Sequence, residues 1–238
     1  MNLTLITVVK NDKHNLEATI KSVLSQNYKD FEYIIFDGMS SDGIESVIEK
    51  YKNNNIKYIR KSDKNYYDGL NKTIKIAKGN YIGILNAGDI YYDKNILKIV
   101  MERILMTKCD LLFGNLKYHD LKNKYTRIWK FNILHLNKLS ALKIASPTLF
   151  IKKEIAKTFP YNIKYYISSD TDFNLRIASK NYTFVYLNKF LISMKKEGLS
   201  TRHSLLINKI SQDFLILKKH FGLFFLVIYL YKILIKIL

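Results

Sequence analysis

The alternation of strand-like and helix-like segments over the first 115 residues is the feature that most constrains this chain. Short apolar runs alternate there with segments whose apolar residues recur every three or four positions. Such alternation is typical of a parallel β-sheet with helices packed on both faces. The sequence therefore predicts an α/β fold with a mostly parallel central sheet, whose strand ends meet at one edge. The expected strands are residues 3–9, 31–36, 56–59, 81–85 and 110–113.

The second half of the chain has a weaker pattern. We expect a β-hairpin within residues 117–131, a strand at 147–151, a helix at 169–178 and a strand at 182–187. Five apolar residues at helical spacing then predict one long helix that continues into the C-terminal segment. These residues are Leu206, Ile210, Phe214, Leu217 and Phe221.

Composition narrows the classes of partner. The chain has 39 Lys and Arg residues against 20 Asp and Glu, a net charge of +19. Such a surface attracts polyanions: nucleic acid, anionic lipid or phosphorylated small molecules. The sole cysteine, Cys109, cannot form a disulfide within the chain, which fits a reducing compartment. The N-terminal residues lack the features of a signal peptide and are predicted to form the first strand.

The C-terminal segment 221–238 is almost wholly apolar, with Lys232 and Lys236 as its charged residues. Spanning a bilayer takes about 20 apolar residues, so the segment is borderline in length. We expect a helical tail that lies in the membrane interface, with its lysines reaching the headgroups. The alternative is a helix buried against the domain or against a partner.

Polar clusters that contain carboxylates follow four of the expected strands. Carboxylates gathered at one sheet edge repel each other unless cations or hydrogen-bond donors compensate. A hard divalent cation that bridges a diphosphate is one such compensation. A turn or a helix cap would explain a single cluster, whereas four in succession favour a ligand site. The clusters are residues 10–12, 37–43, 63–68 and 86–89.

Two runs carry a resemblance to a known family. The run IIFDGMSSDG, residues 34–43, is similar to the DGGSxDGT form of the signature of family-2-like GT-A glycosyltransferases. The run SDKNYYDGLNKTIKIAKGNYIGILNAGD, residues 62–89, resembles a stretch of a polysaccharide-synthesis subgroup of that family. The resemblance is dense over residues 3–89, thins over 146–203 and is absent from the tail. It implies the Rossmann-like GT-A fold and inverting transfer of a sugar from a nucleotide-sugar, with UDP as the favoured nucleotide.

For the donor, the resemblance implies a base pocket and a set of polar contacts. Asp37 would hydrogen-bond the nucleotide base, and Thr7 and Val9 at the end of the first strand would line the same pocket. The residues that the resemblance places in contact with the nucleotide-sugar are Asp68, Asn71, Lys72 and Asn86.

A divalent metal ion, Mn²⁺ or Mg²⁺, is implied at the DxD-type motif, where Asp89 matches the last acid. The chain departs from this motif, since Asn86 and Gly88 stand at the positions of its other acids. Lysines such as Lys72 would then share in neutralising the leaving diphosphate. His203 is a further candidate ligand, because imidazole suits Mn-like ions. The alternative for His203 is a solvent-facing residue at a helix start.

The catalytic base implied by the resemblance is Asp170, which aligns with the acid of an ED or SD motif at a helix start. No Glu precedes it, so Asp172 is the alternative base; its other interpretation is an acidic residue stabilised by the helix dipole. Residues 198–200 resemble a GGxS loop near the acceptor. A carboxylate within about 3 Å of the acceptor hydroxyl would take its proton, which typically contributes about 10²–10⁴-fold in rate.

Together these features predict a glycosyltransferase domain over residues 1–203 and a helical tail over residues 204–238. Residues 1–115 would bind the nucleotide-sugar, and residues 116–203 would bind the acceptor. We expect a saccharide or lipid-linked saccharide acceptor and a cytoplasmic enzyme, peripheral on the inner face of the cell membrane. The alternative is a non-catalytic module for membranes or polyanions on the same scaffold. Nucleic-acid binding is disfavoured, because most aromatic residues lie at core-like spacing.

Overall fold

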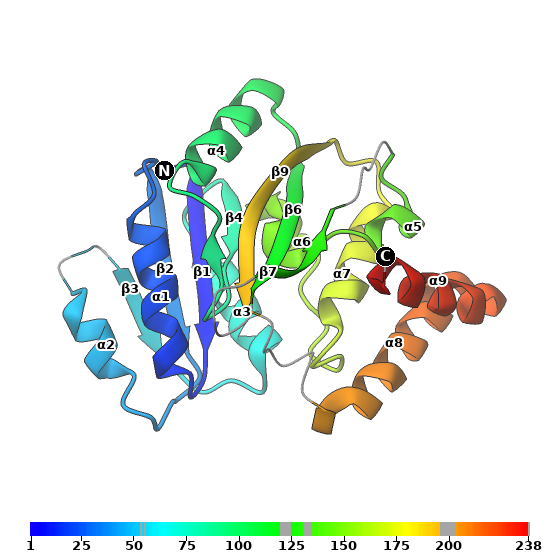
Figure 1. Cartoon of the computed structure of the whole chain (residues 1–238), viewed down its shortest axis with the longest axis horizontal. Helices are drawn as coiled ribbons and strands as arrows, with labels where there is room; N and C mark the ends of the chain where they lie inside the picture. The colour runs from blue at the N-terminus through cyan, green and yellow to red at the C-terminus, as the bar shows by residue number, and fades with distance from the viewer. Residues whose placement is uncertain (53, 55, 120–124, 131–134, 196–202, 238) are drawn as a thin grey trace.

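The computed structural model describes residues 1–52, 54, 56–119, 125–130, 135–195 and 203–237. Within these residues nine strands form one mixed sheet in the order β3-β2-β1-β4-β8-β6-β9-β5, with β7 paired to β6. Helices flank this sheet on both faces (Figure 1), which confirms the predicted fold class. The strands are β1 (Leu3–Val9), β2 (Phe31–Asp37), β3 (Ile56–Arg60), β4 (Tyr81–Ile84), β5 (Ile90–Tyr91), β6 (Leu111–His119), β7 (Tyr125–Trp129), β8 (Phe150–Lys152) and β9 (Phe184–Lys195).

The α-helices follow the expected alternation in the first half of the chain and cluster toward the C-terminus in the second. The predicted helix at residues 169–178 is α7, with the same bounds. The α-helices are α1 (Lys13–Leu24), α2 (Glu45–Lys50), α3 (Tyr66–Ile76), α4 (Ile96–Thr107), α5 (Lys138–Ala141), α6 (Lys153–Thr158), α7 (Ser169–Ala178), α8 (Leu206–Phe221) and α9 (Phe225–Ile237).

Strand β1 lies between β2 and β4 and pairs with both in parallel. All seven of its residues are buried, and they alternate between the two faces of the sheet as strand geometry requires. Leu3 and Leu5 belong to the apolar cluster that contains side chains of α1 and α4, whereas Ile6 and Val8 belong to the cluster that contains side chains of α3 and α6. Two packed layers therefore hold β1 in place, and with it the carboxyl ends of its neighbours.

The second half of the chain departs from the parallel pattern. Strand β8 runs antiparallel between β4 and β6, and β7 folds back on β6 as the predicted hairpin. The strand expected at 147–151 is observed as β8, which begins only at Phe150. Ser146–Thr148 forms a 3-10 turn before it, since Pro147 has no N–H to donate a hydrogen bond to a neighbouring strand. Strand β9 continues to Lys195, well beyond the expected end at residue 187. Its register against β6 shifts at Gly114 and Asn115, and this irregularity bends β9 toward β5.

The C-terminal segment is a hairpin of two helices, which corrects the predicted single long helix. Helix α8 ends at Phe221, and Gly222 then adopts φ 57° and ψ −129°, a conformation that residues with side chains rarely adopt. Helix α9 turns back along α8, so that the ring of Phe214 lies 5.7 Å from that of Phe225 and 4.4 Å from that of Tyr229. The apolar pattern of the sequence continues past Gly222 without a break, so it predicted one helix. The backbone conformation of Gly222 reverses the direction of the chain.

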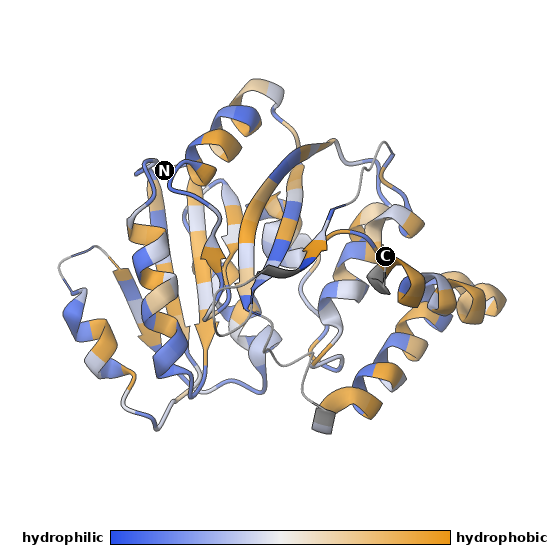
Figure 2. Cartoon of the chain, viewed as in Figure 1, coloured by the Kyte–Doolittle hydropathy of each residue, from blue (hydrophilic) through white to orange (hydrophobic). Residues whose placement is uncertain are grey.

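By length and composition alone, residues 206–235 are long and apolar enough to cross a membrane. As a hairpin, α8 and α9 have 16 and 13 residues, so each is about 20–24 Å long and shorter than a hydrocarbon core of about 30 Å. Figure 2 shows apolar residues along the outside of both helices. The exposed fractions are 80% for Ile207, 96% for Leu223, 73% for Phe224, 65% for Val227 and 61% for Leu230.

One lysine of α9 points inward and fastens the hairpin to α7. Lys232 is 4% exposed, and its Nζ lies 2.9 Å from Asp213 Oδ1 and donates to the Thr171 hydroxyl at 3.1 Å. Burial lowers the pKa of Lys232, and the charge of Asp213 opposes this shift. A buried ammonium group requires such partners. The lysine therefore does not reach lipid headgroups, which corrects the expectation that both tail lysines would do so.

Candidate active site

The parallel registers bring the polar segments after β1, β2 and β4 to one edge of the sheet. Val9 pairs with Asp37, and the backbone N–H of Gly38 donates to the carbonyl of Val9 at 2.9 Å. On the other side of β1, the backbone N–H of Leu85 donates to the carbonyl of Ile6 at 3.0 Å. The segment that begins at Asp37 and the one that leads to Asp89 therefore flank the end of β1, as the alternation predicted.

Asp37 ends β2 and is completely buried. Its Oδ1 accepts hydrogen bonds from the backbone N–H and the hydroxyl of Ser40 at 2.8 and 2.5 Å. Its Oδ2 accepts one from the Tyr58 hydroxyl at 2.7 Å and lies 3.5 Å from Nε of Arg60. Met39 closes this turn with φ 61°, at the position where the resembling signature has glycine. The carboxylate already has several donors, so a nucleotide base that bonds to it must share or replace them.

Asp63 is a member of this edge that the sequence analysis did not single out. A Cβ added to Gly38 would lie 2.5 Å from Asp63 Oδ2, and one added to Gly69 would lie 3.3 Å from it. Two glycines therefore make room for this carboxylate beside Asp37. Burial raises the pKa of Asp63, and the charges of Lys10 and Lys72 oppose that shift. The available signal was its place in the polar cluster after the third strand.

Asp89 is a buried carboxylate held by neutral donors. It is 3% exposed; its Oδ2 accepts from Asn86 Nδ2 at 3.0 Å and its Oδ1 accepts from the backbone N–H of Lys195 at 3.2 Å. Across the described ranges, no cationic side chain forms an ion pair with it. Burial raises the pKa of Asp89 to about 7, although both hydrogen bonds lower it. Near neutral pH this group is therefore poised to ionise if a cation approaches.

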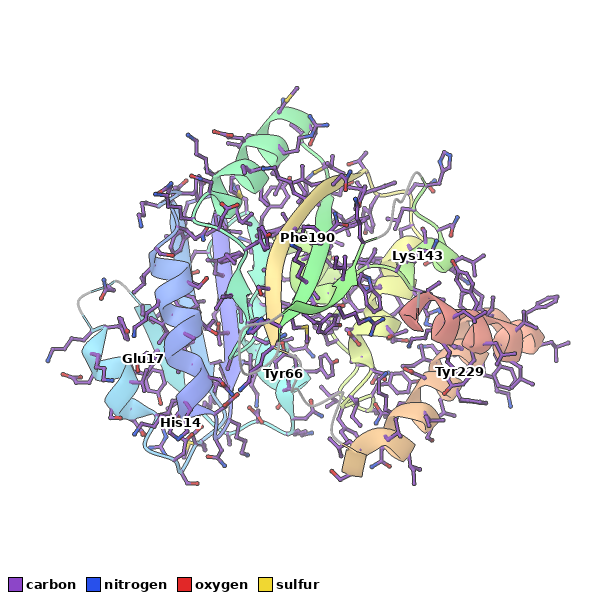
Figure 3. The ribbon with its side chains drawn as sticks, viewed as in Figure 1. His14, Glu17, Tyr66, Lys143, Phe190 and Tyr229 are labelled. Atoms are coloured by element: carbon purple, nitrogen blue, oxygen red, sulfur yellow. The ribbon has the colours of Figure 1, made fainter. Side chains whose placement is uncertain are left out.

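Tyr66, at the start of α3, lies near the centre of the molecule (Figure 3). Its hydroxyl donates to Oδ1 of Asn86, the residue that holds Asp89. Burial raises the pKa of Tyr66, and electrostatic repulsion from Tyr161 (when ionised) and from the carboxylates Asp89 and Asp170 raises it further. Asp89 and Asp170, far apart in the sequence, are therefore both near this phenol.

Asp170 lies in the first turn of α7 and is partly exposed. Its Oδ1 accepts from the backbone N–H of Thr171 at 2.8 Å, and its Oδ2 lies 3.4 Å from the Ser146 hydroxyl. The Tyr67 hydroxyl lies 3.5 Å from the backbone nitrogen of Asp170 and ties α7 to the start of α3. The Asp170 carboxylate is therefore partly open to solvent and, like Asp89, lies near Tyr66.

Asp172 has a different environment, although it is only two residues away. It is completely buried, and its oxygens lie 2.7 Å from Arg176 Nε, 3.0 Å from His220 Nε2 and 3.3 Å from Lys219 Nζ. Burial raises its pKa, but the hydrogen bond from His220 and the charge of Arg176 outweigh burial and lower it to about 2. A buried carboxylate with three partners is suited to joining α7 to α8 and not to taking a proton.

The other predicted donor contacts are engaged within the protein. Thr7 is buried, with its hydroxyl 2.7 Å from the carbonyl oxygen of Leu85, and Val9 is buried in the core. Asn71 holds the segment after α6, because its side chain donates to the carbonyl of Tyr161 and accepts from the backbone N–H of Tyr161, both at 2.8 Å. A further pair on α3 joins Lys72 Nζ to Asp68 Oδ2 at 2.7 Å. Asp68, Asn71 and Lys72 line a pocket on the outer side of α3.

The predicted acceptor loop and the side chain of His203 both lie outside the described part of the chain. Residues 198–200, the GGxS-like loop, lie outside the described residues. His203 begins the 3-10 turn His203–Leu205, but its side chain is outside the description. Among the described residues, no three His, Cys, Asp or Glu side chains gather as metal ligands. The predicted ligand role of His203 therefore stays a prediction.

Comparison with known sequences finds relatives over most of the chain. The profile of Glycosyl transferase family 2 matches residues 4–169. An uncharacterised glycosyltransferase of Methanocaldococcus jannaschii is 29% identical over 205 residues, which are 82% of this chain and 70% of that protein. The Escherichia coli UDP-Glc:alpha-D-GlcNAc-diphosphoundecaprenol beta-1,3-glucosyltransferase WfaP is 37% identical over 98 residues, which are 40% of this chain and 38% of WfaP.

Solved structures share the fold at low sequence identity. Staphylococcus aureus TarS, residues 1–349, in complex with UDP-GlcNAc matches with a TM-score of 0.73 and 18% identity, over 91% of this chain and 66% of TarS. The mannosyltransferase PcManGT of Pyrobaculum calidifontis, in complex with GDP-Man and Mn²⁺, matches with a TM-score of 0.68 and 14% identity, over 92% of this chain and 63% of PcManGT. This chain therefore spans about two thirds of the length of these structures.

Proposed function

Because this chain belongs to glycosyl transferase family 2 and is thereby a transferase, we propose that it transfers a sugar from a nucleotide-sugar to an acceptor hydroxyl with inversion at the anomeric carbon. The observation that carries this proposal is the convergence of Asp89 and Asp170 on Tyr66 at the edge that also holds Asp37. The acceptor we propose is a saccharide or a lipid-linked saccharide in surface polysaccharide synthesis. The chain's likeness to WfaP, whose name contains UDP-Glc and a diphosphoundecaprenol acceptor, supports this class.

The donor would lie over the carboxyl ends of β1, β2 and β4. Asp37 and Asp63 are the two carboxylates beside the end of β2, where a base with N–H donors would find acceptors. Thr7 and Val9 would support this pocket from beneath, because both are buried. Asn86 stands between Tyr66 and Asp89, where the sugar diphosphate would pass. Asp68, Asn71 and Lys72 would act by holding the outer wall of α3, because their polar atoms already have partners.

The residues around Asp89 would suit a divalent cation that takes most of its ligands from the substrate. Asp89 supplies one buried carboxylate with no ion-pair partner in the described part of the chain, and its ionisation would be favoured by a bound cation. Mg²⁺ at phosphate sites is commonly bound through one or two carboxylates and the phosphate oxygens. A bound Mn²⁺ or Mg²⁺ would stabilise the charge of the departing nucleoside diphosphate. We propose Asp89 as its protein ligand, with His203 as a second candidate.

The acceptor hydroxyl would lose its proton to Asp170. This carboxylate is partly exposed, whereas Asp172 is buried and engaged by the side chains of Arg176, Lys219 and His220. A base that activates a hydroxyl on the side of the sugar opposite the diphosphate gives inversion. Tyr67 holds the start of α3 against the start of α7 and the residue Ile167 just before it, which would fix the distance between the donor side and the base.

We further propose that the α8–α9 hairpin docks the enzyme on the cytoplasmic face of a membrane. Among the described residues, eight apolar side chains of this hairpin are more than half exposed, a surface that water disfavours. Both helices are too short to span a bilayer singly, so the hairpin would lie in the interface. Deleting residues 204–238 should release the protein from sedimenting membranes, provided the shortened chain folds. Point changes Leu223→Asp and Phe224→Asp test the same surface without removing the hairpin.

A panel of nucleotide-sugars, assayed with lipid-linked acceptors in the presence of Mn²⁺ or Mg²⁺, tests the proposed transfer. The matching nucleoside diphosphate should raise the unfolding free energy by about 2.7 kcal/mol at a hundredfold excess over Kd. The absence of a thermal shift with every nucleotide, together with no transfer, would favour a non-catalytic module. A shift without transfer would point to an acceptor of another class.

A further inference from the structure

The pocket on the outer side of α3 that Asp68, Asn71 and Lys72 line has a volume of about 610 Å³. Its walls come from α3, from the segment 157–163, from α7 and from α8. Five cationic side chains line it: Lys72, Lys75, Lys157, Arg176 and Lys219. Its carboxylates are Asp68 and Asp172. The pocket therefore carries three more positive than negative side chains.

Both carboxylates of this pocket are neutralised by partners within the protein. Asp68 accepts from Lys72 at 2.7 Å, and Asp172 pairs with Arg176 at 2.7 Å. Lys75 and Lys157 are exposed, and within the described part of the chain neither takes part in an ion pair. These two ammonium groups remain available for an anion that enters the pocket.

An aromatic stack separates the pocket from the edge that holds Asp170. The ring of Tyr67 lies 5.4 Å from that of Tyr161, and Tyr161 lies 4.5 Å from Phe173 in a stacked arrangement. Tyr161 lines the pocket, whereas the hydroxyl of Tyr67 contacts the backbone nitrogen of Asp170. The pocket is therefore a site apart from the donor site proposed above.

The pocket adjoins the exposed apolar surface of the hairpin. Lys219 is one helical turn after Leu215 in α8, so both side chains lie on one face of the helix. Leu215 is 55% exposed, and Leu223 at the turn of the hairpin is 96% exposed. A membrane that contacts these apolar residues would present its phosphate groups near Lys219.

We propose that this pocket binds the phosphate group of an anionic lipid headgroup. Arginine and lysine side chains recognise phosphate through charge-assisted hydrogen bonds, and basic pockets beside membrane-contacting helices suit acidic headgroups. The inference rests on the proposed membrane docking of the hairpin, and it adds a specific ionic contact to that apolar one. The proposed ligand of this pocket is a lipid phosphate and not the diphosphate of the sugar donor, because the aromatic stack lies between the pocket and the edge that holds Asp170.

The test is the binding of the full chain to sedimenting vesicles of phosphatidylcholine, with and without phosphatidylglycerol. The pocket variant carries Lys75→Gln and Lys157→Gln, and the matched control carries Lys57→Gln and Lys94→Gln, which remove the same charge from exposed positions elsewhere. We expect the pocket variant to bind anionic vesicles roughly tenfold to thirtyfold more weakly than the wild type, and the control to lose threefold or less. Binding to neutral vesicles should be the same for all three proteins.

Equal losses in the two variants would overturn the proposal, because the attraction would then be a property of net charge. A pocket variant that loses the thermal shift with uridine diphosphate would overturn the lipid assignment in favour of a nucleotide. Transfer to a detergent-solubilised acceptor is measured in parallel. The pocket variant should retain it, so failure of the proposed function, seen as no transfer by the wild type, is distinct from failure of the lipid site.

Discussion

Asp89 and Asp172 are both buried carboxylates, but their surroundings are opposite. Asp89, at the carboxyl edge of the parallel half, is held by two amide donors, and burial raises its pKa to about 7. Asp172, between α7 and the hairpin, lies against Arg176, Lys219 and His220; there the partners outweigh burial and lower its pKa to about 2. A buried acid that lacks a cation is suited to receive one, whereas an acid that already has several is suited to hold helices together.

Asp170 shares helix α7 with Asp172 and the reacting region with Asp89, so it allows the sharpest test. Asp170→Asn removes the proposed base and should lower the transfer rate by about 10²–10⁴-fold. The donor affinity should be unchanged, because Asp170 is not among the groups beside Asp37. Steady-state kinetics and nucleotide thermal shifts measure the two effects. Transfer at the wild-type rate would remove Asp170 from the mechanism.

Asp172→Asn should act on stability and not on chemistry. Removing one partner of a buried ion-pair cluster typically costs about 3–5 kcal/mol. Denaturant unfolding measures this loss, and transfer at a temperature where the variant is folded should stay near the wild-type rate. Because the pKa of Asp172 is lowered from its ordinary value, its contribution is present above pH of about 4 and is lost as the pH falls through about 2. A folded Asp172→Asn variant that has lost transfer would reverse the roles of the two acids.

The pH dependence of stability should carry the opposite sign for Asp89. Its pKa is raised in the folded state, so the unfolded chain ionises first as the pH rises. The unfolding free energy should therefore fall, by up to about 4 kcal/mol, between pH of about 4 and about 7, and this slope should be reduced in Asp89→Asn. Added Mn²⁺ should bind more tightly as the pH rises through about 7, because the ion needs the carboxylate. If the unfolding free energy of Asp89→Asn fell with pH as steeply as that of the wild type, a group other than Asp89 would be responsible for the pH dependence.

Lys232→Met should give the smallest effect. Asp213 would lose one partner but keep Lys209, whose Nζ lies 3.1 Å from its other oxygen. We expect a loss of about 1–2 kcal/mol in unfolding free energy, close to that of one charged hydrogen bond. Lys232→Arg is the control, since it retains the charge. A variant as stable as the wild type would mean that apolar contacts alone hold α9 against α7.

The sequence was sufficient for the fold class and for the parallel first half of the sheet, because hydrophobic periodicity reports which side of each element is buried. The strand ends of the first half, and the gathering of Asp37 and Asp89 there, follow from alternation in a parallel sheet. The family resemblance added Asp170, which the weaker periodicity of the second half would not have indicated. The same reasoning passed over Asp63, although it lies in a cluster that had been marked.

The sequence by itself determined a parallel α/β half with acids at its edge, a family, and an apolar C-terminal segment, because spacing and residue type encode these directly. Only the tertiary structure decided which acid is engaged and which is open, since Arg176, Lys219 and His220 reach Asp172 from two helices. It also decided that the tail reverses at Gly222 and buries Lys232. Periodicity reports that a residue is buried, but the partner that it meets depends on how distant segments pack.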